Sequence, residues 1–268
     1  MPEGKDSYVN DFSILVATVN GSGSQTANNV LIKSIFQMGV PVSGKNIFPS
    51  NIAGLPTWFS IRASGKSHLA RKKTSDILIA LNQETFADDV RGLKSGAVVI
   101  HESSFKTVDK REDLIYYPVP FGEISALCCP DLKLRKYVTN MIYVGVAGAL
   151  LGIDQSEMES ALGKVFRKKQ KALEVNSAAL KAGFEHAGTR IEKKDPFRIE
   201  KMNGTTGKIL IDGNYAAAVG AIFAGCAVCA WYPITPASTL GEAMAELARK
   251  YRRDKTTGKL NCAIVQSE

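Results

Sequence analysis

A five-residue loop near the carboxyl end of the sequence combines groups that can hold a small ligand. It reads Tyr232-Pro233-Ile234-Thr235-Pro236 and lies between an apolar run and a helical pattern. The two prolines fix their own φ angles and keep the residues before them out of the helical region, so the loop is rigid. Open α/β sheets bind ligands where a strand ends and a helix begins, and the Thr235 hydroxyl can hydrogen-bond a carboxylate or keto oxygen without adding a charge. The alternative is a proline-rich turn that only ends the strand.

A glycine-rich turn near the amino end could approach an anionic group closely. Gly21 and Gly23 follow an apolar run at residues 12–19 and precede a helical pattern at residues 27–38. The order of strand, glycine turn and helix is that of dinucleotide-binding folds. The third glycine of that fingerprint is absent, however, and no acidic residue ends the second strand near Phe48.

The five cysteines and three histidines do not follow a metal-binding pattern. Cys226 and Cys229 form a CxxC within an apolar run of small residues, where helix packing is favoured over a metal or redox role. The other cysteines and the histidines lack ligand spacing; they are Cys128, Cys129, Cys262, His68, His101 and His186. We therefore expect reduced thiols and no iron-sulfur cluster on this chain.

Strand and helix patterns alternate through the first part of the chain. Apolar runs predict strands at residues 12–19, 46–48, 58–62, 77–81, 97–101 and 115–119, and helical stretches fall between or after them, the longest at residues 132–151. This alternation predicts an α/β fold with a mostly parallel sheet covered on both faces. Residues 154–187 are helical and charged and close a first domain at residues 1–187, with Gly183 as the expected helix end.

A second α/β pattern follows a polar segment. Residues 188–207 are punctuated by Gly and Pro and predict a linker. In the second domain, residues 208–268, strands are predicted at residues 208–211, 228–231 and 262–266, and helices at residues 214–224 and 238–251, the latter capped by Ser238. A domain of about 60 residues with three strands buries little core, so we expect the opening part of a larger domain, in a fragment or a split subunit.

The composition is that of an ordinary soluble protein. The chain has 268 residues, 45% of them hydrophobic, and a formal charge of +8. It contains no apolar run long enough for a bilayer and no signal peptide, so a cytoplasmic location without membrane contact is expected. The positive charge would attract anionic substrates and phosphorylated cofactors. Its basic clusters lack interleaved aromatic residues, which argues against nucleic-acid binding.

Two parts of the chain resemble one known family. Residues 213–221, followed by the loop at residues 232–238, closely resemble the pyrimidine-binding domain at the α subunit of 2-oxoacid:ferredoxin oxidoreductases. The first domain resembles the γ domain of that family, through residues 52–62 and 76–82. A γ domain fused ahead of the α domain is more typical of enzymes that act on 2-oxoglutarate. The resemblance implies a Rossmann-like γ domain followed by the start of a thiamine-diphosphate pyrimidine-binding α/β domain.

The resemblance implies roles for individual residues. The threonine of the loop contacts the 2-oxoacid in this family, which assigns substrate binding to Thr235 and its loop neighbour Tyr232. A glutamate follows at the end of the next strand, here Glu268. A carboxylate hydrogen-bonded to the aminopyrimidine ring of thiamine diphosphate promotes the imino tautomer, whose nitrogen removes the thiazolium proton. Without the upstream loop, Glu268 would be interpreted as a solvated terminal residue.

The resemblance also implies cofactors and partners. Thiamine diphosphate is shared with a β subunit, which holds Mg and at least one [4Fe-4S] cluster, and coenzyme A is the co-substrate. The implied assembly is a dimer of αβ heterodimers. The implied reaction is the oxidative decarboxylation of 2-oxoglutarate to succinyl-CoA, or its reverse, with electrons passed to ferredoxin. This chain would be inactive alone.

The glycine turn departs from the family pattern. Family γ domains often read Gly-x-Gly-Gly-Gln-Gly, whereas two of those glycines are replaced here by Ser24 and Thr26. Three interpretations stay open for Gly21 and Gly23: a contact with coenzyme A phosphates, NAD binding, and a structural tight turn. The alternative functions are accordingly an NAD-dependent Rossmann dehydrogenase and a non-catalytic assembly subunit.

Overall fold

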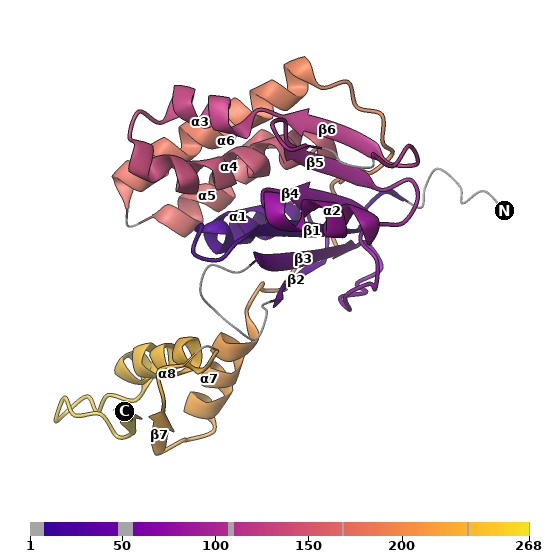
Figure 1. Ribbon diagram of the computed structural model, residues 1–268. Helices are drawn as coiled ribbons and strands as arrows, with labels where there is room; N and C mark the ends of the chain where they lie inside the picture. Colours follow the sequence, from indigo (N-terminus) through magenta and orange to yellow (C-terminus); the bar gives the residue numbers. More distant parts are fainter. Residues whose placement is uncertain (1–7, 48–55, 107–109, 168, 235, 268) are drawn as a thin grey trace. The chain divides into compact units, whose positions relative to one another are not determined.

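The chain forms two compact units, Met1–Lys208 and Ile209–Glu268 (Figure 1). The computed structural model describes residues 8–47, 56–106, 110–167, 169–234 and 236–267. The expected α/β fold is confirmed, since strands and helices alternate along both units.

A six-stranded sheet forms the centre of the first unit, in the order β2-β3-β1-β4-β5-β6. The strands are β1 Asp11–Val19, β2 Val42–Ile47, β3 Pro56–Ser64, β4 Ile77–Ala80, β5 Val98–Glu102 and β6 Ile115–Val119. β1, β4, β5 and β6 pair in parallel, whereas β3 pairs antiparallel with both β1 and β2. The prediction of a mostly parallel sheet is therefore confirmed, and β3 is the strand that runs against the others.

Helices cover both faces of this sheet (Figure 1). They are α1 Ser24–Gln37, α2 Gln83–Arg91, α3 Phe121–Cys128, α4 Leu132–Leu151, α5 Gln155–Phe166 and α6 Gln170–Arg190. On β1, Ile14 faces a small cavity that α4 also lines, whereas Ala17 packs with Phe86 of α2 on the other face. This alternation follows from the two-residue repeat of a strand. Among the described residues, no helix is both long enough and apolar enough to span a bilayer.

The helices α4 and α6 cross with their backbones in contact. A Cβ atom on Gly145 would lie 2.1 Å from the carbonyl oxygen of Leu180, and one on Gly183 would lie 2.2 Å from that of Ile142. The sequence prediction that Gly183 ends its helix is therefore wrong, because α6 continues to Arg190. Because Gly183 has no side chain, the backbones of α4 and α6 can approach each other closely at this position.

The segment after α6, which the sequence predicts as a linker, is fastened to the first unit. The Ile199 amide donates to the carbonyl of Leu151 at 2.7 Å, and the Thr205 hydroxyl donates to the carbonyl of Phe36 at 3.0 Å. The Tyr117 hydroxyl of β6 donates to the Asp195 carboxylate at 2.9 Å, and burial raises the pKa of Tyr117 to about 12. These contacts satisfy polar groups that a free linker would leave to water.

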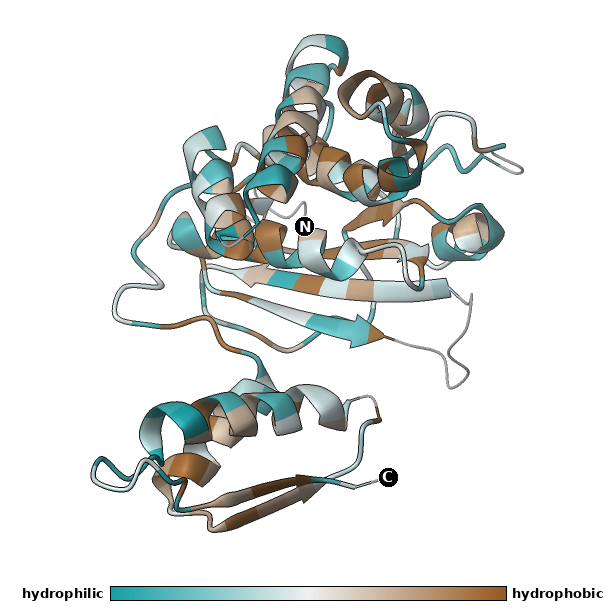
Figure 2. Cartoon of the chain, turned by 90° about the vertical axis from the view of Figure 1, so that its left-hand side faces the viewer, coloured by the Kyte–Doolittle hydropathy of each residue, from teal (hydrophilic) through white to brown (hydrophobic). Residues whose placement is uncertain are grey.

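The second unit is a parallel strand pair with two helices. Its elements are α7 Gly213–Phe223, β7 Val228–Trp231, α8 Ala237–Tyr251 and β8 Ala263–Gln266. The helices pack on the strands through Ile222, Met244 and Leu247, while Val228 and Val265 are exposed. Both strands are apolar along most of their length (Figure 2).

Two details of the second unit differ from the sequence prediction. Residues 208–211 do not form a strand: among the described residues, this short apolar run pairs with no strand, and Ile209 is 76% exposed. Helix α8 starts at Ala237 after Pro236 and has no side-chain cap, which places Ser238 inside its first turn.

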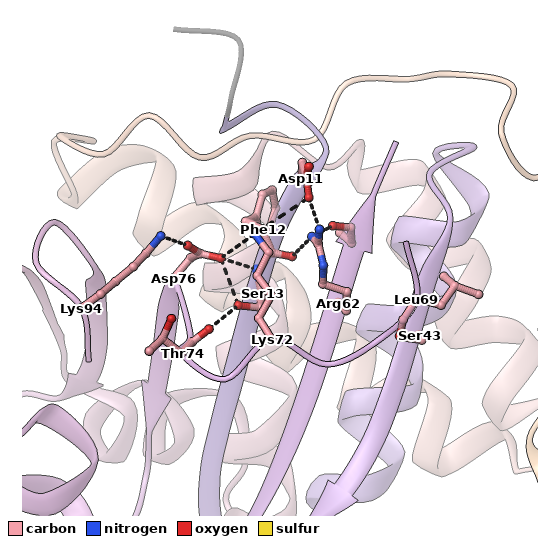
Figure 3. Close-up of polar contacts among 11 residues, drawn as sticks. Asp11, Phe12, Ser13, Ser43, Arg62, Leu69, Lys72, Thr74, Asp76 and Lys94 are labelled. Carbon is pink, nitrogen blue, oxygen red and sulfur yellow. Dashed lines mark hydrogen bonds and ion pairs between the residues drawn. The ribbon is translucent and has the colours of Figure 1, made fainter. Parts of the chain in front are cut away.

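A polar network connects β1 and β3 with residues that precede β4 and β5 in the first unit (Figure 3). Asp76, which is 3% exposed, accepts hydrogen bonds from the amide and hydroxyl of Ser13 at 2.7 and 3.0 Å. The Lys94 ammonium lies 2.5 Å from the other oxygen of Asp76. Arg62 of β3 pairs with Asp11 of β1. The network neutralises a carboxylate that the fold has buried.

Replacing Asp76 by alanine should lower the free energy of unfolding by about 2 kcal/mol, because the Ser13 amide is left buried without its acceptor. Urea unfolding measures the loss. Asp88→Ala is the matched control, since it removes an ion pair with Arg91 in which both side chains are 76% exposed. That control should leave stability unchanged. Equal losses in the two variants would contradict the prediction.

Candidate functional site

A pocket opens at the carboxyl end of β1 in the first unit. Its volume is about 390 Å³. It is lined by Thr18, Val19, Asn20, Gly21, Ser22, Leu81, Lys136, Thr139 and Asn140. This edge of a parallel sheet is where open α/β folds bind their ligands. The lining includes one lysine and no carboxylate, so the pocket favours an anion.

The glycine turn forms one wall of this pocket and leads into α1. Gly21 and Gly23 have φ angles of 77° and 82°, which side-chain-bearing residues rarely adopt. Gly23 is the N-cap of α1, and neither a capping side chain nor an acidic residue neutralises the first turn of that helix. Since the first N–H groups of a helix lack partners within it, this end of α1 suits an anionic group.

Buried polar side chains hold the turn in place. The Asn140 amide of α4 donates to the carbonyl of Ser22 at 2.6 Å, and Asn140 is 3% exposed. The Tyr143 hydroxyl donates to the Asn28 side chain at 2.8 Å, and burial raises the pKa of Tyr143. The Thr18 hydroxyl donates to that of Ser24 at 3.0 Å. The turn is therefore fixed before any ligand arrives.

Sequence reasoning missed the contribution of α4 to this site. Lys136 and Asn140 lie in the long helix that was read only as a structural element. A signal was present, because Asn140 is an amide within an otherwise apolar stretch of that helix. A buried amide needs partners. The partner could not be identified from the sequence, because Ser22 lies 118 residues away.

The Tyr-Pro-Ile-Thr-Pro loop leaves the end of β7 in the second unit. Tyr232 is 57% exposed, and its carbonyl accepts a hydrogen bond from the Ile234 amide at 2.8 Å. The Asn214 amide of α7 donates to the carbonyl of Pro236 at 2.9 Å and to the Thr239 hydroxyl at 2.6 Å. The loop is thus braced by the starts of both helices. Thr235 itself lies outside the described residues.

The end of β8 lies beside the strand end from which this loop departs. Trp231 is opposite Gln266, and the Ser267 amide donates to the carbonyl of Trp231 at 2.8 Å. A Cβ atom on Gly241 would lie 2.2 Å from the Trp231 ring, so α8 packs directly on that ring. Glu268, the next residue, lies outside the described residues.

The cysteines of the second unit lie in and around its small core. Cys226 is in the turn between α7 and β7, where its thiol donates to the carbonyl of Val228 at 3.2 Å. The expectation that the CxxC packs within a helix is therefore wrong, because Cys226 lies in a turn and Cys229 in β7. Burial raises the pKa of Cys229, and the nearby Cys226 and Cys262 raise it further. Within the described part of the chain, no group of three or more His, Cys, Asp or Glu side chains could hold a metal ion.

The histidine at the end of β5 does not line the pocket at the end of β1. His101 is 5% exposed, and its Nδ1 lies 2.9 Å from the carbonyl oxygen of Glu102. Its ring packs near Phe86 and Tyr116, with centroid distances of 5.2 and 6.0 Å. Burial lowers the pKa of His101, which keeps the ring neutral near neutral pH.

Comparison with known proteins connects these sites to one family. The family model described as pyruvate ferredoxin/flavodoxin oxidoreductase matches residues 13–186. A curated relative, the α subunit of 2-oxoacid:ferredoxin oxidoreductase 1 from Sulfurisphaera tokodaii, is 24% identical over 96% of this chain and 46% of its own length. The chain thus spans about half the length of the curated relatives that it matches over most of its own length.

Solved structures agree with this match. A 2-oxoglutarate:ferredoxin oxidoreductase from Magnetococcus marinus, with 2-oxoglutarate, coenzyme A and succinyl-CoA bound, superposes with a TM-score of 0.80 at 25% identity. The match covers 97% of this chain and 43% of that one. The γ subunit of a keto/oxoacid ferredoxin oxidoreductase from Geobacter sulfurreducens shares the fold over 66% of this chain and 98% of its own, with a TM-score of 0.54 and 20% identity.

The resemblance inferred from the loop and the first domain is therefore confirmed. It holds for the family and for its α subunits, since curated relatives of that description align with nearly the whole chain. The family model covers more than half of the sequence. The chain belongs to the pyruvate ferredoxin/flavodoxin oxidoreductase family.

Proposed function

We propose that the chain supplies the γ domain and the start of the pyrimidine-binding domain of a 2-oxoglutarate:ferredoxin oxidoreductase. The complete enzyme would convert 2-oxoglutarate and coenzyme A to succinyl-CoA and carbon dioxide, or catalyse the reverse, with ferredoxin as the electron carrier. The observation that carries this proposal is the likeness over 97% of the chain to the Magnetococcus enzyme that binds 2-oxoglutarate and coenzyme A. The other relatives include enzymes named for ketoisovalerate, so the 2-oxoacid is the part to test first.

The second unit would contribute the groups nearest to the substrate. In the proposal, the hydroxyls of Tyr232 and Thr235 bind the 2-oxoacid, and Glu268 exchanges a proton with the aminopyrimidine ring of thiamine diphosphate. The Ser267–Trp231 hydrogen bond supports this arrangement, because it brings the end of β8 beside the start of the loop. Thiamine diphosphate supplies the electron sink for decarboxylation when bound.

The first unit would hold the anionic part of coenzyme A. In the proposal, Gly21 and Gly23 let the phosphates approach the backbone at the start of α1, and Lys136 adds a positive charge at the rim. The uncapped start of α1 supports this contact, and the positive φ angles of both glycines, which a purely structural turn would also require, are compatible with it. Asn140 acts through the turn by holding the Ser22 carbonyl.

The remaining chemistry would come from a β subunit. We propose that it binds the diphosphate of thiamine diphosphate with Mg and holds the [4Fe-4S] cluster that passes electrons to ferredoxin. The complex would be a dimer of αβ heterodimers in the cytoplasm. The absence of a suitable cysteine cluster among the described residues is compatible with this division.

The test is a reconstitution of the complete complex with its β subunit. With thiamine diphosphate bound, a viologen dye should be reduced only when coenzyme A and a 2-oxoacid are both present, and fastest with 2-oxoglutarate in a panel of 2-oxoacids. Faster dye reduction with another 2-oxoacid would overturn the assignment of 2-oxoglutarate as the substrate but would support the proposed type of reaction. No dye reduction by a complex that contains thiamine diphosphate and iron would overturn the proposed reaction.

A further inference from the structure

A basic loop joins β3 to β4 in the first unit. Residues 66–74, here called the basic loop, include four cations and no acidic residue; the cations are Lys66, Arg71, Lys72 and Lys73. Every residue of the loop is exposed. Because β3 runs antiparallel to β1, the loop leaves the sheet at the edge where β1 begins. The pocket at the end of β1 lies at the opposite edge, and no residue of the loop lines it.

The backbone of the basic loop is anchored to two strands. The Ser43 hydroxyl of β2 donates to the carbonyl of Leu69 in the middle of the loop at 2.6 Å (Figure 3). The Ser13 hydroxyl of β1 donates to the carbonyl of Thr74 at the end of the loop at 3.2 Å. A loop that is already ordered loses little backbone entropy when a partner binds to it.

The acidic residues beside the loop neutralise only part of its charge. The Lys72 ammonium lies 4.0 Å from the Asp11 carboxylate and 3.9 Å from the Asp76 carboxylate. Asp76 is shared with Lys94, whose ammonium lies 2.5 Å from it. Among the described residues, no carboxylate pairs with the other three cations of the loop, Lys66, Arg71 and Lys73. The loop therefore keeps a net positive charge that faces solvent.

The edge strand β2 adds a cation on the same side of the sheet. Ser43 reaches the loop, and Lys45 faces the same way because side chains alternate along a strand. Gly44 faces α1 instead, since a Cβ atom there would lie 2.2 Å from Ile32 Cδ1. Lys45 is exposed. Lys45 and the basic loop together form a surface that we call the basic surface.

The composition of the basic surface favours a protein over other anionic partners. Leu69 is 50% exposed among the cations, so the surface offers an apolar contact beside its charges, as protein interfaces do. The loop has no aromatic side chain on which a nucleic-acid base could stack. It forms no helix, whereas segments that lie on membranes are commonly amphipathic helices. Lysine and arginine on one surface are complementary to aspartate and glutamate on another.

We infer that the basic surface docks an acidic segment of a partner protein. Carboxylates of that segment would pair with Lys66, Arg71 and Lys73, and an apolar side chain between them would contact Leu69. The inference is independent of the proposed reaction, because the surface lies at the edge of the sheet opposite the pocket at the end of β1. Exposed charges are screened over about 10 Å at 0.1 M salt, so the binding should depend strongly on ionic strength.

The test measures the binding of fluorescently labelled poly-L-glutamate to the full chain by anisotropy. A variant that combines Lys66→Gln, Arg71→Gln and Lys73→Gln should bind the polymer about tenfold more weakly, since three exposed ion pairs are lost. The matched control removes the same number of charges from exposed lysines outside the basic surface, through Lys133→Gln, Lys194→Gln and Lys255→Gln. It should bind nearly as well as the wild type.

The outcomes separate a docking surface from a general effect of charge. A loss confined to the loop variant, with native circular dichroism and with wild-type binding that weakens at high salt, would support the inference. Equal losses in the two variants would mean that binding follows net charge, which overturns it, as does a wild type that does not bind the polymer. Tighter binding of a single-stranded oligonucleotide of equal charge, lost in the loop variant, would assign the surface to nucleic acid instead.

Discussion

Replacing Glu268 by glutamine should lower the turnover of the assembled oxidoreductase by about two to four orders of magnitude, the usual contribution of a positioned acid or base. The reason is chemical, because a carboxylate can exchange a proton with the aminopyrimidine ring and an amide cannot. The side chain keeps its size, so the binding of thiamine diphosphate should change much less than turnover. Dye reduction at saturating 2-oxoacid measures the effect, and the thiamine diphosphate content of the purified complex shows whether the cofactor stays bound.

Glu242→Gln provides the matched control for this prediction. Glu242 is an exposed residue of α8, and the same change of charge there should leave turnover unchanged. A Glu268→Gln complex that carries the cofactor and turns over at the wild-type rate would remove Glu268 from the proposed proton exchange. The family membership of the chain would be unaffected by that outcome.

The same glycine-to-alanine change should have opposite effects on the free energy of unfolding at two positions of α6. Gly183→Ala should lower the free energy of unfolding by about 2–3 kcal/mol, because the new methyl group would meet the backbone of α4 and force the helices apart. Gly188→Ala has nothing within 4 Å of the added atom. Alanine is the better helix former by up to about 1 kcal/mol, so this variant should be slightly more stable than the wild type.

Urea unfolding of both variants, followed by circular dichroism, measures the difference. Comparison within one helix removes the effect of intrinsic helix preference, because both positions gain the same methyl group. Equal destabilisation of the two variants would contradict the idea that Gly183 is needed for the close crossing of α4 and α6. A loss at Gly183 that is absent at Gly188 would confirm it.

Local patterns predicted much of the fold. The strands β6 and β7 and the helix α4 were predicted with their observed bounds, because each contains a run of apolar residues that sets it off from the segments around it. Hydrophobic periodicity reports which side of a segment is buried, and burial is what forms these elements. The loop at residues 232–236 was found for a different reason, since two prolines restrict the chain wherever they occur.

Contacts between distant segments could not be predicted in this way. The antiparallel course of β3 depends on its pairing with β1 and β2, and Gly183 depends on Ile142 of another helix. Residues 208–211 were predicted as a strand because they contain three consecutive apolar residues, but among the described residues they pair with no strand. A pocket between α4, α5 and α6 was also missed, since Tyr137 and Phe166, which line it, look like ordinary helix residues in the sequence.

The close crossing of α4 and α6 has a consequence for ligand binding. α4 carries Lys136 and Asn140, and its backbone rests on α6 at Gly145 without intervening side chains that could change rotamer. The wall that α4 contributes to the pocket at the end of β1 is therefore rigid in the free protein. A ligand would find its partners already ordered, and little of its binding free energy would be lost to conformational entropy.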